Sequence, residues 1–153
     1  MTDFPIETRT ARPFAFLSRS AALPDMPATM GALYQAVAAA FAAARAPMEG
    51  PAWCRYTAFD GTTVGFDAGF AARSQDCDAL RAAGLSIGET PSGRVMTGWH
   101  VGPYDTVSAT YDAMQAAMKA AGVTGTETMW EAYHSPPGTP PEETRTQVVW
   151  PLA

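Results

Sequence analysis

The sequence feature that most constrains the fold is an internal duplication with a spacing of 77 residues. Three pairs of aromatic residues keep this spacing in one register, and each pair occupies the same place in two predicted series of elements. The pairs are Tyr34 and Tyr111, Trp53 and Trp130, and Tyr56 and Tyr133. Self-similarity at a fixed period indicates a repeated structural unit, so the chain is expected to fold as two units of strand, helix, strand and strand.

Hydrophobic periodicity places these elements along the chain. Apolar residues recur at three- and four-residue steps over 28–45 and 107–118, which is typical of helices with one apolar stripe. Strands are predicted at an edge within 1–10 and over 11–20, 52–59, 62–72, 93–101, 126–135 and 144–152. Asp60 and Gly61 predict a hairpin turn, and Gly122 suits a left-handed end for the second helix.

The predicted fold class is α+β, with duplicated β-α-β-β units related by pseudo-two-fold symmetry. Their antiparallel sheets are expected to carry helices on one face and a ligand groove on the other. The first repeat covers about 11–72 and the second about 93–153, within a single domain of 153 residues. Between them, 73–92 has no clear pattern except a short helical turn through Leu80 that Asp76 could cap.

Composition and charge argue against several classes of protein. Hydrophobic residues make up 47% of the chain and charged residues 16%, which is typical of a packed core and not of a disordered chain. The net charge of −5 argues against specific DNA binding. No apolar run reaches the roughly 20 residues of a membrane span, so no membrane partner is expected.

The two cysteines, Cys54 and Cys77, provide neither a disulfide framework nor a set of metal ligands, and a reducing cytoplasm suits them. The sequence has no phosphate loop, zinc pattern, Ser-His-Asp signature or dinucleotide fingerprint, so no cofactor or metal is predicted. We therefore expect a cytoplasmic protein, a monomer or weak dimer, whose partner is a small molecule.

The second repeat resembles a known family in several short segments. They are His100-Val101-Gly102-Pro103-Tyr104-Asp105, Tyr111, Trp130-Glu131-Ala132-Tyr133 and the stretch from Thr146 to Pro151-Leu152. These segments are similar to those of the GyrI-like small-molecule-binding domain. The family includes DNA gyrase inhibitor proteins, effector-binding domains of multidrug-sensing regulators and hydrolases of cyclopropane-bearing toxins. The resemblance covers essentially the whole chain and implies the duplicated β-α-β-β fold.

The resemblance also implies a site in the second repeat. The family places a glutamate in this sheet, at the floor of an aromatic pocket, and the matching residue is Glu131. In the drug-sensing members the glutamate attracts cationic ligands, and in the hydrolytic members a pocket glutamate acts with a tyrosine. The last strand begins Thr146-Gln147, where the family often has Thr-Glu.

Strand alternation puts Glu131 and Tyr133 on one face of their strand. The duplication puts Cys54 and Tyr56 on the equivalent face of the first repeat, so these four side chains could converge on one groove. Further candidate ligand-binding residues are the possible aromatic walls Trp99 and Trp150 and the helix residue Tyr111. The aromatic residues could equally pack in the core. A carboxylate among rings is costly to bury unless it is paired or protonated, which suits a cationic ligand or a raised pKa.

Three functions remain open at this point. The first is a stand-alone protein that captures an amphipathic aromatic cation in a groove between the two repeats. The second is a hydrolase of strained-ring electrophiles, in which Glu131 acts as general base and Tyr133 donates a hydrogen bond to the leaving group. The third is a protein–protein modulator of the gyrase-inhibitor type.

Overall fold

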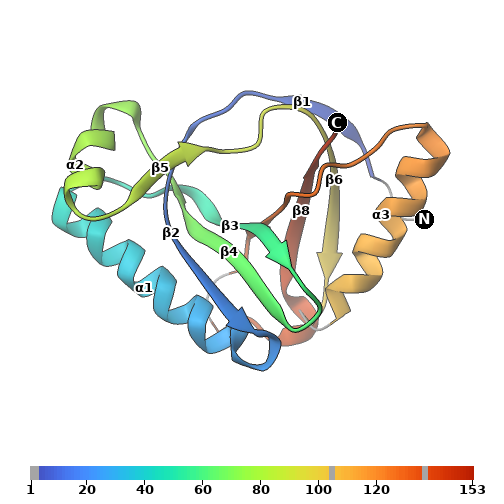
Figure 1. The fold of residues 1–153 in the computed structure, drawn as a ribbon, viewed down its shortest axis with the longest axis horizontal. Coiled ribbons are helices and arrows are strands. Elements are labelled where there is room, and N and C mark those ends of the chain that lie inside the picture. Colours follow the sequence, from blue (N-terminus) through green and yellow to red (C-terminus); the bar gives the residue numbers. More distant parts are fainter. Residues whose placement is uncertain (1–3, 104–105, 136–137) are drawn as a thin grey trace. The chain divides into compact units, whose positions relative to one another are not determined.

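The structure is a computed structural model that describes residues 4–103, 106–135 and 138–153. The chain divides into two compact units: the repeat-1 unit consists of residues 11–90, and the repeat-2 unit of residues 1–10 and 91–153. In each unit, the described residues form an antiparallel sheet of four strands with a long helix packed against it (Figure 1). The predicted α+β class with antiparallel sheets is confirmed.

The repeat-1 unit has its strands in the order β3-β4-β2-β5. Its elements are β2 (Pro13–Ala22), α1 (Met26–Ala44), β3 (Glu49–Phe59), β4 (Thr63–Ala71), α2 (Cys77–Ala82) and β5 (Ser86–Glu89). Helix α1 includes Pro27 because proline fits the first helical turn, where its missing N–H has no partner to lose. The Asp60 carboxylate accepts the backbone N–H groups of Thr63 and Thr62, which lowers its pKa, and Gly61 completes the predicted hairpin turn with a φ of 98°.

The repeat-2 unit has its strands in the order β1-β6-β8-β7. Its elements are β1 (Ile6–Arg9), β6 (Gly93–Val101), α3 (Val107–Ala121), β7 (Met129–Tyr133) and β8 (Arg145–Pro151). Strand β7 starts later than predicted because the Thr126 hydroxyl donates to the Thr128 carbonyl in a local turn. Gly122 ends α3 with a φ of 70°, so the predicted left-handed cap is confirmed.

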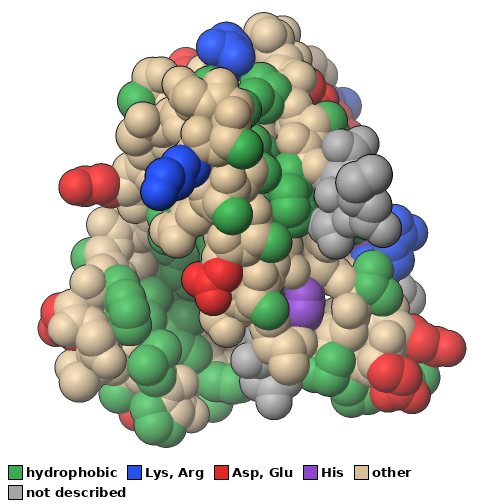
Figure 2. Space-filling model, turned by 90° about the vertical axis from the view of Figure 1, so that its right-hand side faces the viewer, with side chains coloured by type: hydrophobic (Ala, Val, Ile, Leu, Met, Phe, Trp, Pro, Cys, Tyr) green, Lys and Arg blue, Asp and Glu red, His purple; other side chains and the backbone are tan. Residues whose placement is uncertain are grey.

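No helix in the described part of the chain is long and apolar enough to cross a membrane. On the face drawn in Figure 2, Lys and Arg side chains lie singly among other side chains instead of gathering into one area. This distribution accords with the net charge of −5.

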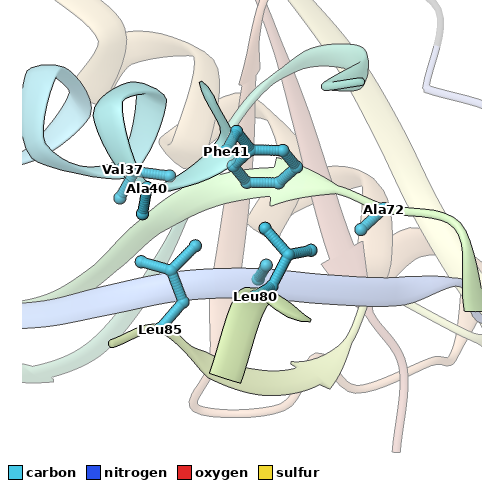
Figure 3. Close-up of a cluster of buried hydrophobic side chains, with 7 residues drawn as sticks. Val37, Ala40, Phe41, Ala72, Leu80 and Leu85 are labelled. Carbon is cyan, nitrogen blue, oxygen red and sulfur yellow. The ribbon is translucent and has the colours of Figure 1, made fainter. Parts of the chain in front are cut away.

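The hydrophobic core of the repeat-1 unit lies between its sheet and both of its helices. Figure 3 shows Val37 and Phe41 of α1 beside Leu80 of α2 and Leu85, which precedes β5. All four side chains are buried, and burial of a large apolar side chain stabilises a fold by about 1.5–3 kcal/mol. The stretch 73–92, which the sequence pattern leaves unassigned, therefore completes this core.

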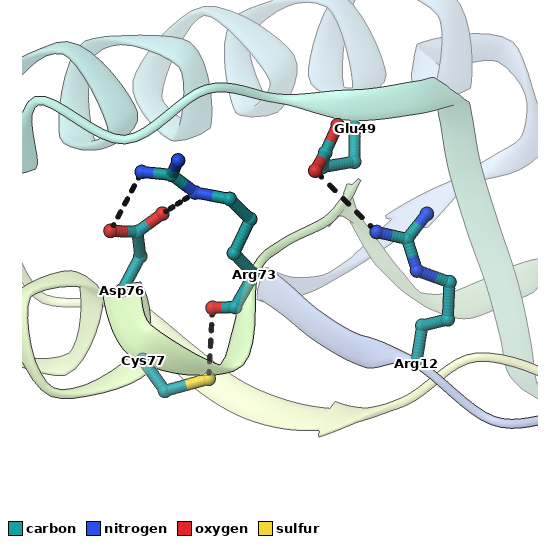
Figure 4. A network of polar contacts seen from close by, with 5 residues as sticks. All are labelled: Arg12, Glu49, Arg73, Asp76 and Cys77. Carbon is teal, nitrogen blue, oxygen red and sulfur yellow. Dashed lines mark hydrogen bonds and ion pairs between the residues drawn. The ribbon is translucent and has the colours of Figure 1, made fainter.

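The start of α2 differs from its prediction. The short helix forms, but Asp76 at its N-cap makes no capping hydrogen bond through its side chain. Instead, the Asp76 carboxylate accepts hydrogen bonds from the Arg73 guanidinium at 2.7 and 3.3 Å (Figure 4). The same view shows the Cys77 thiol near the Arg73 carbonyl and an ion pair between Arg12 and Glu49. The predicted capping role of Asp76 is therefore wrong, because the nearby guanidinium outcompetes the helix for its carboxylate.

Candidate functional site

Glu131 lies in the middle of β7 and is only 1% exposed. It pairs across the sheet with Val148 of β8, and Val148 packs beneath α3 with Met114 and Met118. Residues directly opposite each other in antiparallel strands share a face, so Glu131 lies on the face of the sheet that α3 covers. The sequence predicts a ligand groove on the face opposite the helices. The Glu131 side chain instead lies on the face that α3 covers.

Two tyrosine hydroxyl groups hold the Glu131 carboxylate. The Tyr111 hydroxyl of α3 donates to Oε2 at 2.6 Å, and the Tyr133 hydroxyl donates to Oε1 at 2.9 Å. Tyr133 lies two residues further along β7 and therefore on the same face. Hydrogen bonds to an ionised oxygen are short and strong, and they offset part of the cost of removing the charge from water.

Aromatic and apolar side chains surround this cluster. The Trp150 ring meets the Tyr111 ring edge to face, with 5.7 Å between the ring centroids. The Trp150 indole is held in place because its N–H donates to the Thr126 carbonyl at 2.9 Å. Gly125 is required beneath it, since a Cβ there would lie 2.4 Å from the indole nitrogen. Glu131 is therefore in contact with a phenol from the helix that itself packs against a fixed indole.

The position of Tyr111 follows from the apolar stripe of α3. Val107, Tyr111, Met114 and Met118 recur at three- and four-residue steps and all pack in the repeat-2 core. A tyrosine in such a stripe can bury its ring and still send its hydroxyl to a polar partner on the sheet. Of the residues predicted for the site, the structure brings together Glu131, Tyr133, Tyr111 and Trp150.

Trp99 lies away from this cluster. Its neighbours Gly98 and His100 face α3, so strand alternation turns Trp99 to the opposite side of the sheet. There it is 39% exposed, with the Arg145 guanidinium 4.5 Å from the centroid of its ring. The His134 ring meets the Trp99 ring edge to face, with 4.9 Å between the ring centroids. These three side chains form a second aromatic and cationic group that the sequence pattern does not predict.

The His134 side chain lies at the surface, with part of its ring covered by Trp99. This partial burial does most to lower the pKa below the ordinary value of the imidazole, and the positive charges of Arg145 and Arg9 lower it further. Protonation would add a positive charge beside two existing ones. The surroundings of Trp99 therefore disfavour the charged form of His134.

Cys54 and Tyr56 lie on β3, in the repeat-1 unit. Ala52 pairs with Phe70, which packs against the core beneath α1, and strand alternation gives Cys54 and Tyr56 the same face. Cys54 is fully buried and stands 77 residues before Glu131. The repeat-1 unit therefore has a thiol at the position where the repeat-2 unit has its acid.

The equivalent tyrosines of the two helices bond to the following strand in different ways. The Tyr34 hydroxyl of α1 donates to the backbone carbonyl of Trp53 at 2.6 Å. Its counterpart Tyr111 donates to the side chain of Glu131 at the same distance. The duplicated helix-to-strand contact is thus present in both units, and the acceptor is a carboxylate only in the repeat-2 unit.

The repeat-1 unit also holds a buried ion pair that was not predicted. Asp67 is 6% exposed and accepts hydrogen bonds from the Arg55 guanidinium at 2.8 Å and from the Ser18 hydroxyl. The Arg55 guanidinium lies over the rings of Phe14 and Phe16, 5.7 and 5.0 Å from their centroids. An aspartate within an otherwise apolar strand is the sequence signal for such a pair, because a buried carboxylate needs a partner.

The fold and a family model together place the chain in a class of small-molecule-binding domains. A family model described as the GyrI-like small molecule binding domain matches residues 2–153, and the chain belongs to this family. None of the curated proteins matches the sequence significantly.

Solved structures share the fold at low sequence identity. The C-terminal domain of EcmrR is 14% identical, with a TM-score of 0.76 over 100% of this chain and 98% of that one. SAV2435 bound to tetraphenylphosphonium is 9% identical, with a TM-score of 0.71 over 99% and 94% of the two chains. A hydrolase encoded by lin2189 from Listeria innocua is 14% identical, with a TM-score of 0.70 over 98% and 91%.

Proposed function

We propose that this GyrI-like domain binds an amphipathic aromatic cation and that Glu131 is the partner of the positive charge. The observation that carries the proposal is a carboxylate with 1% exposure whose two oxygens each accept a tyrosine hydroxyl. A buried charge is a poor source of stability, because its desolvation costs several kcal/mol that a packed apolar residue would not cost. Such a carboxylate gains most from a ligand that brings the opposite charge.

The rings around Glu131 supply the second part of the recognition. Tyr111, Tyr133 and Trp150 offer aromatic surface to a flat or multi-ring ligand, and each cation–π contact contributes about 0.5–2 kcal/mol. SAV2435, which shares this fold, is bound to tetraphenylphosphonium in its structure. That compound has the chemistry proposed here: a positive charge that carries no hydrogen-bond donor, surrounded by aromatic rings.

Access to the carboxylate requires a side chain to move. Because Glu131 is 1% exposed, a ligand can approach it only when a neighbouring group shifts. Tyr111 is the neighbour that comes from the helix, and it packs among Met114 and Met118. Methionine side chains adapt their shape easily, so this layer can rearrange around a ligand. We therefore expect the side chains of Met114 and Met118 to move when a ligand binds, while Tyr111 keeps its hydrogen bond to Glu131.

Calorimetric titration tests the proposal directly. Tetraphenylphosphonium is compared with triphenylphosphine oxide, which keeps aromatic bulk around phosphorus without a net charge. The cation is expected to bind at least about tenfold more tightly, because its charge pairs with Glu131 and its rings stack on the site. Equal affinities, or no detectable binding of the cation, would contradict the proposal.

A second candidate function is hydrolysis of strained-ring electrophiles, and the pairing of a carboxylate with a phenol favours it. Glu131 would take a proton from water, and the water oxygen would bond to a ring carbon. The ring bond would break, and its electron pair would pass to the conjugated acceptor, which would take the hydroxyl proton of Tyr133. The tyrosine then recovers a proton from Glu131, so that both residues return to their starting state.

Multiple-turnover kinetics separate the two candidates. With a cyclopropane-bearing alkylating compound in large excess, a hydrolase releases many equivalents of product, whereas a binder protects one equivalent. In a hydrolase, Glu131→Gln should lower the rate by about 10²–10⁴-fold, as expected for loss of a general base, and Tyr133→Phe should lower it less. Product that stops at one equivalent, or an unchanged rate in Glu131→Gln, would remove this candidate.

A further inference from the structure

His100 is a buried polar residue outside the cluster around Glu131. It lies near the end of β6, is 8% exposed, and faces α3. Both of its ring nitrogens have partners at the start of the helix. Nε2 lies 2.8 Å from the Pro103 carbonyl oxygen and 3.1 Å from the Thr106 hydroxyl, and Nδ1 lies 2.9 Å from the Thr110 hydroxyl.

The chemistry of these partners assigns the protons. A carbonyl oxygen only accepts, so Nε2 of His100 carries the hydrogen that bonds to Pro103. Nδ1 of the neutral ring then accepts the hydrogen of the Thr110 hydroxyl. The ring is thus bonded in two directions at once, to the turn after β6 and to the second turn of α3. This connects the strand to the helix through a rigid side chain.

The contacts of His100 hold the first two turns of α3, whereas Tyr111 and the methionines hold the helix further along. Its N-cap residue Thr106 makes no capping hydrogen bond and instead donates its hydroxyl to the Pro103 carbonyl. The core side chains beneath the helix, Met114 and Met118, are flexible and tolerate small shifts. Polar contacts of defined geometry restrict such shifts more strictly than the flexible methionines do.

The position of α3 along the sheet decides where the next residue, Tyr111, meets its partner. Tyr111 donates to Glu131 at 2.6 Å, a distance that a shift of the helix by less than one ångström would spoil. We infer that His100 is a positioning residue, which holds the first two turns of α3 where the Tyr111 hydroxyl reaches the Glu131 carboxylate. The effect on affinity rests on the proposed function, whereas the effect on the Tyr111 hydrogen bond does not.

The inference is tested first on binding of tetraphenylphosphonium to the full chain. His100→Leu and Thr110→Val each remove one side of the contact and keep much of the shape, and each should weaken binding about 2- to 10-fold. Ser108→Ala removes an exposed hydroxyl from the same helix and should change nothing. His100→Gln, whose amide both donates and accepts, should recover part of the loss.

A double-mutant cycle separates positioning from general destabilisation. If His100 acts through Tyr111, then His100→Leu should cost little further affinity in a Tyr111→Phe background. Fully additive losses in the two single variants would overturn the inference. Thr110→Val provides the same comparison if His100→Leu does not fold.

Proton NMR of the ligand-free protein gives a second readout that does not depend on the proposed function. The proton of the Tyr111 hydroxyl, whose oxygen lies 2.6 Å from Oε2 of Glu131, should give a downfield resonance that disappears in Tyr111→Phe. The resonance should be lost in His100→Leu or Thr110→Val and kept in Ser108→Ala. Its survival in both His100→Leu and Thr110→Val, or its absence from the wild-type protein, would overturn the inference even if the cation does not bind.

Discussion

Replacing Glu131 by glutamine is expected to weaken the binding of tetraphenylphosphonium by about 30-fold or more. Removing one member of a buried charge pair typically costs at least about 2 kcal/mol, which corresponds to this factor. The amide has nearly the shape of the carboxylate. Because a tyrosine hydroxyl accepts as well as donates, Tyr111 and Tyr133 can both bond to the new side chain. The variant is therefore expected to fold and to lose mainly the charge.

Two controls make this result specific to the site. Glu127→Gln changes the net charge by the same amount at an exposed position just before β7, and it should leave the affinity unchanged. The uncharged triphenylphosphine oxide should bind wild type and Glu131→Gln with similar affinity, because it does not use the carboxylate. A similar loss for both compounds would show that glutamine distorts the site instead of removing a charge partner.

Replacing Gly69 by alanine is expected to lower the free energy of unfolding by about 3 kcal/mol or more. Gly69 lies in β4 between Phe16 of β2 and Trp53 of β3. A Cβ at this position would lie 2.0 Å from the backbone carbonyl oxygen of Ala15 and 2.8 Å from the Cα of Phe16. Backbone atoms of a paired strand cannot move aside without breaking the ladder, so the sheet itself must deform.

Urea denaturation of the whole chain measures this effect, and Gly31→Ala is the matched control. Gly31 lies within α1, and a Cβ there would have no other atom within 4 Å. Alanine favours the helix more than glycine does, so this variant should be more stable by about 0.5–1 kcal/mol. Equal midpoints for Gly69→Ala and wild type would show that the β2 and β4 backbones lie further apart than the structure places them.

The elements that sequence predicted well are those with a strong local signal. The stripe of α3, the Asp60-Gly61 turn and the Gly122 cap each depend on a few neighbouring residues, and the structure contains all three. Within residues 73–92 the sequence predicted only the short helical turn through Leu80, because α2 is short and Leu80 is fixed by packing against α1. Tertiary contacts of this kind leave no periodic pattern in a short segment.

The candidate site shows the same limit. Alternation along β7 places Glu131 and Tyr133 on one face without any knowledge of the fold. The contact from Tyr111 could not be predicted in this way, because it depends on where α3 crosses the sheet. The same is true of Trp99, whose surroundings on the other face come from Arg145 and His134 at the ends of other strands.

A protein with two copies of one fold can divide its tasks between them. The repeat-1 unit has Cys54 at the position of Glu131, and its Tyr34 bonds to a backbone carbonyl, so the proposed ligand-binding acid lies in the repeat-2 unit alone. The two copies also have separate hydrophobic clusters. Mutations that adapt the repeat-2 unit to a new compound therefore need not weaken the core of the repeat-1 unit. With the proposed site in the repeat-2 unit, the usual conflict between stability and function would fall on only one half of the chain, and duplication would leave the scaffold room to change its ligand.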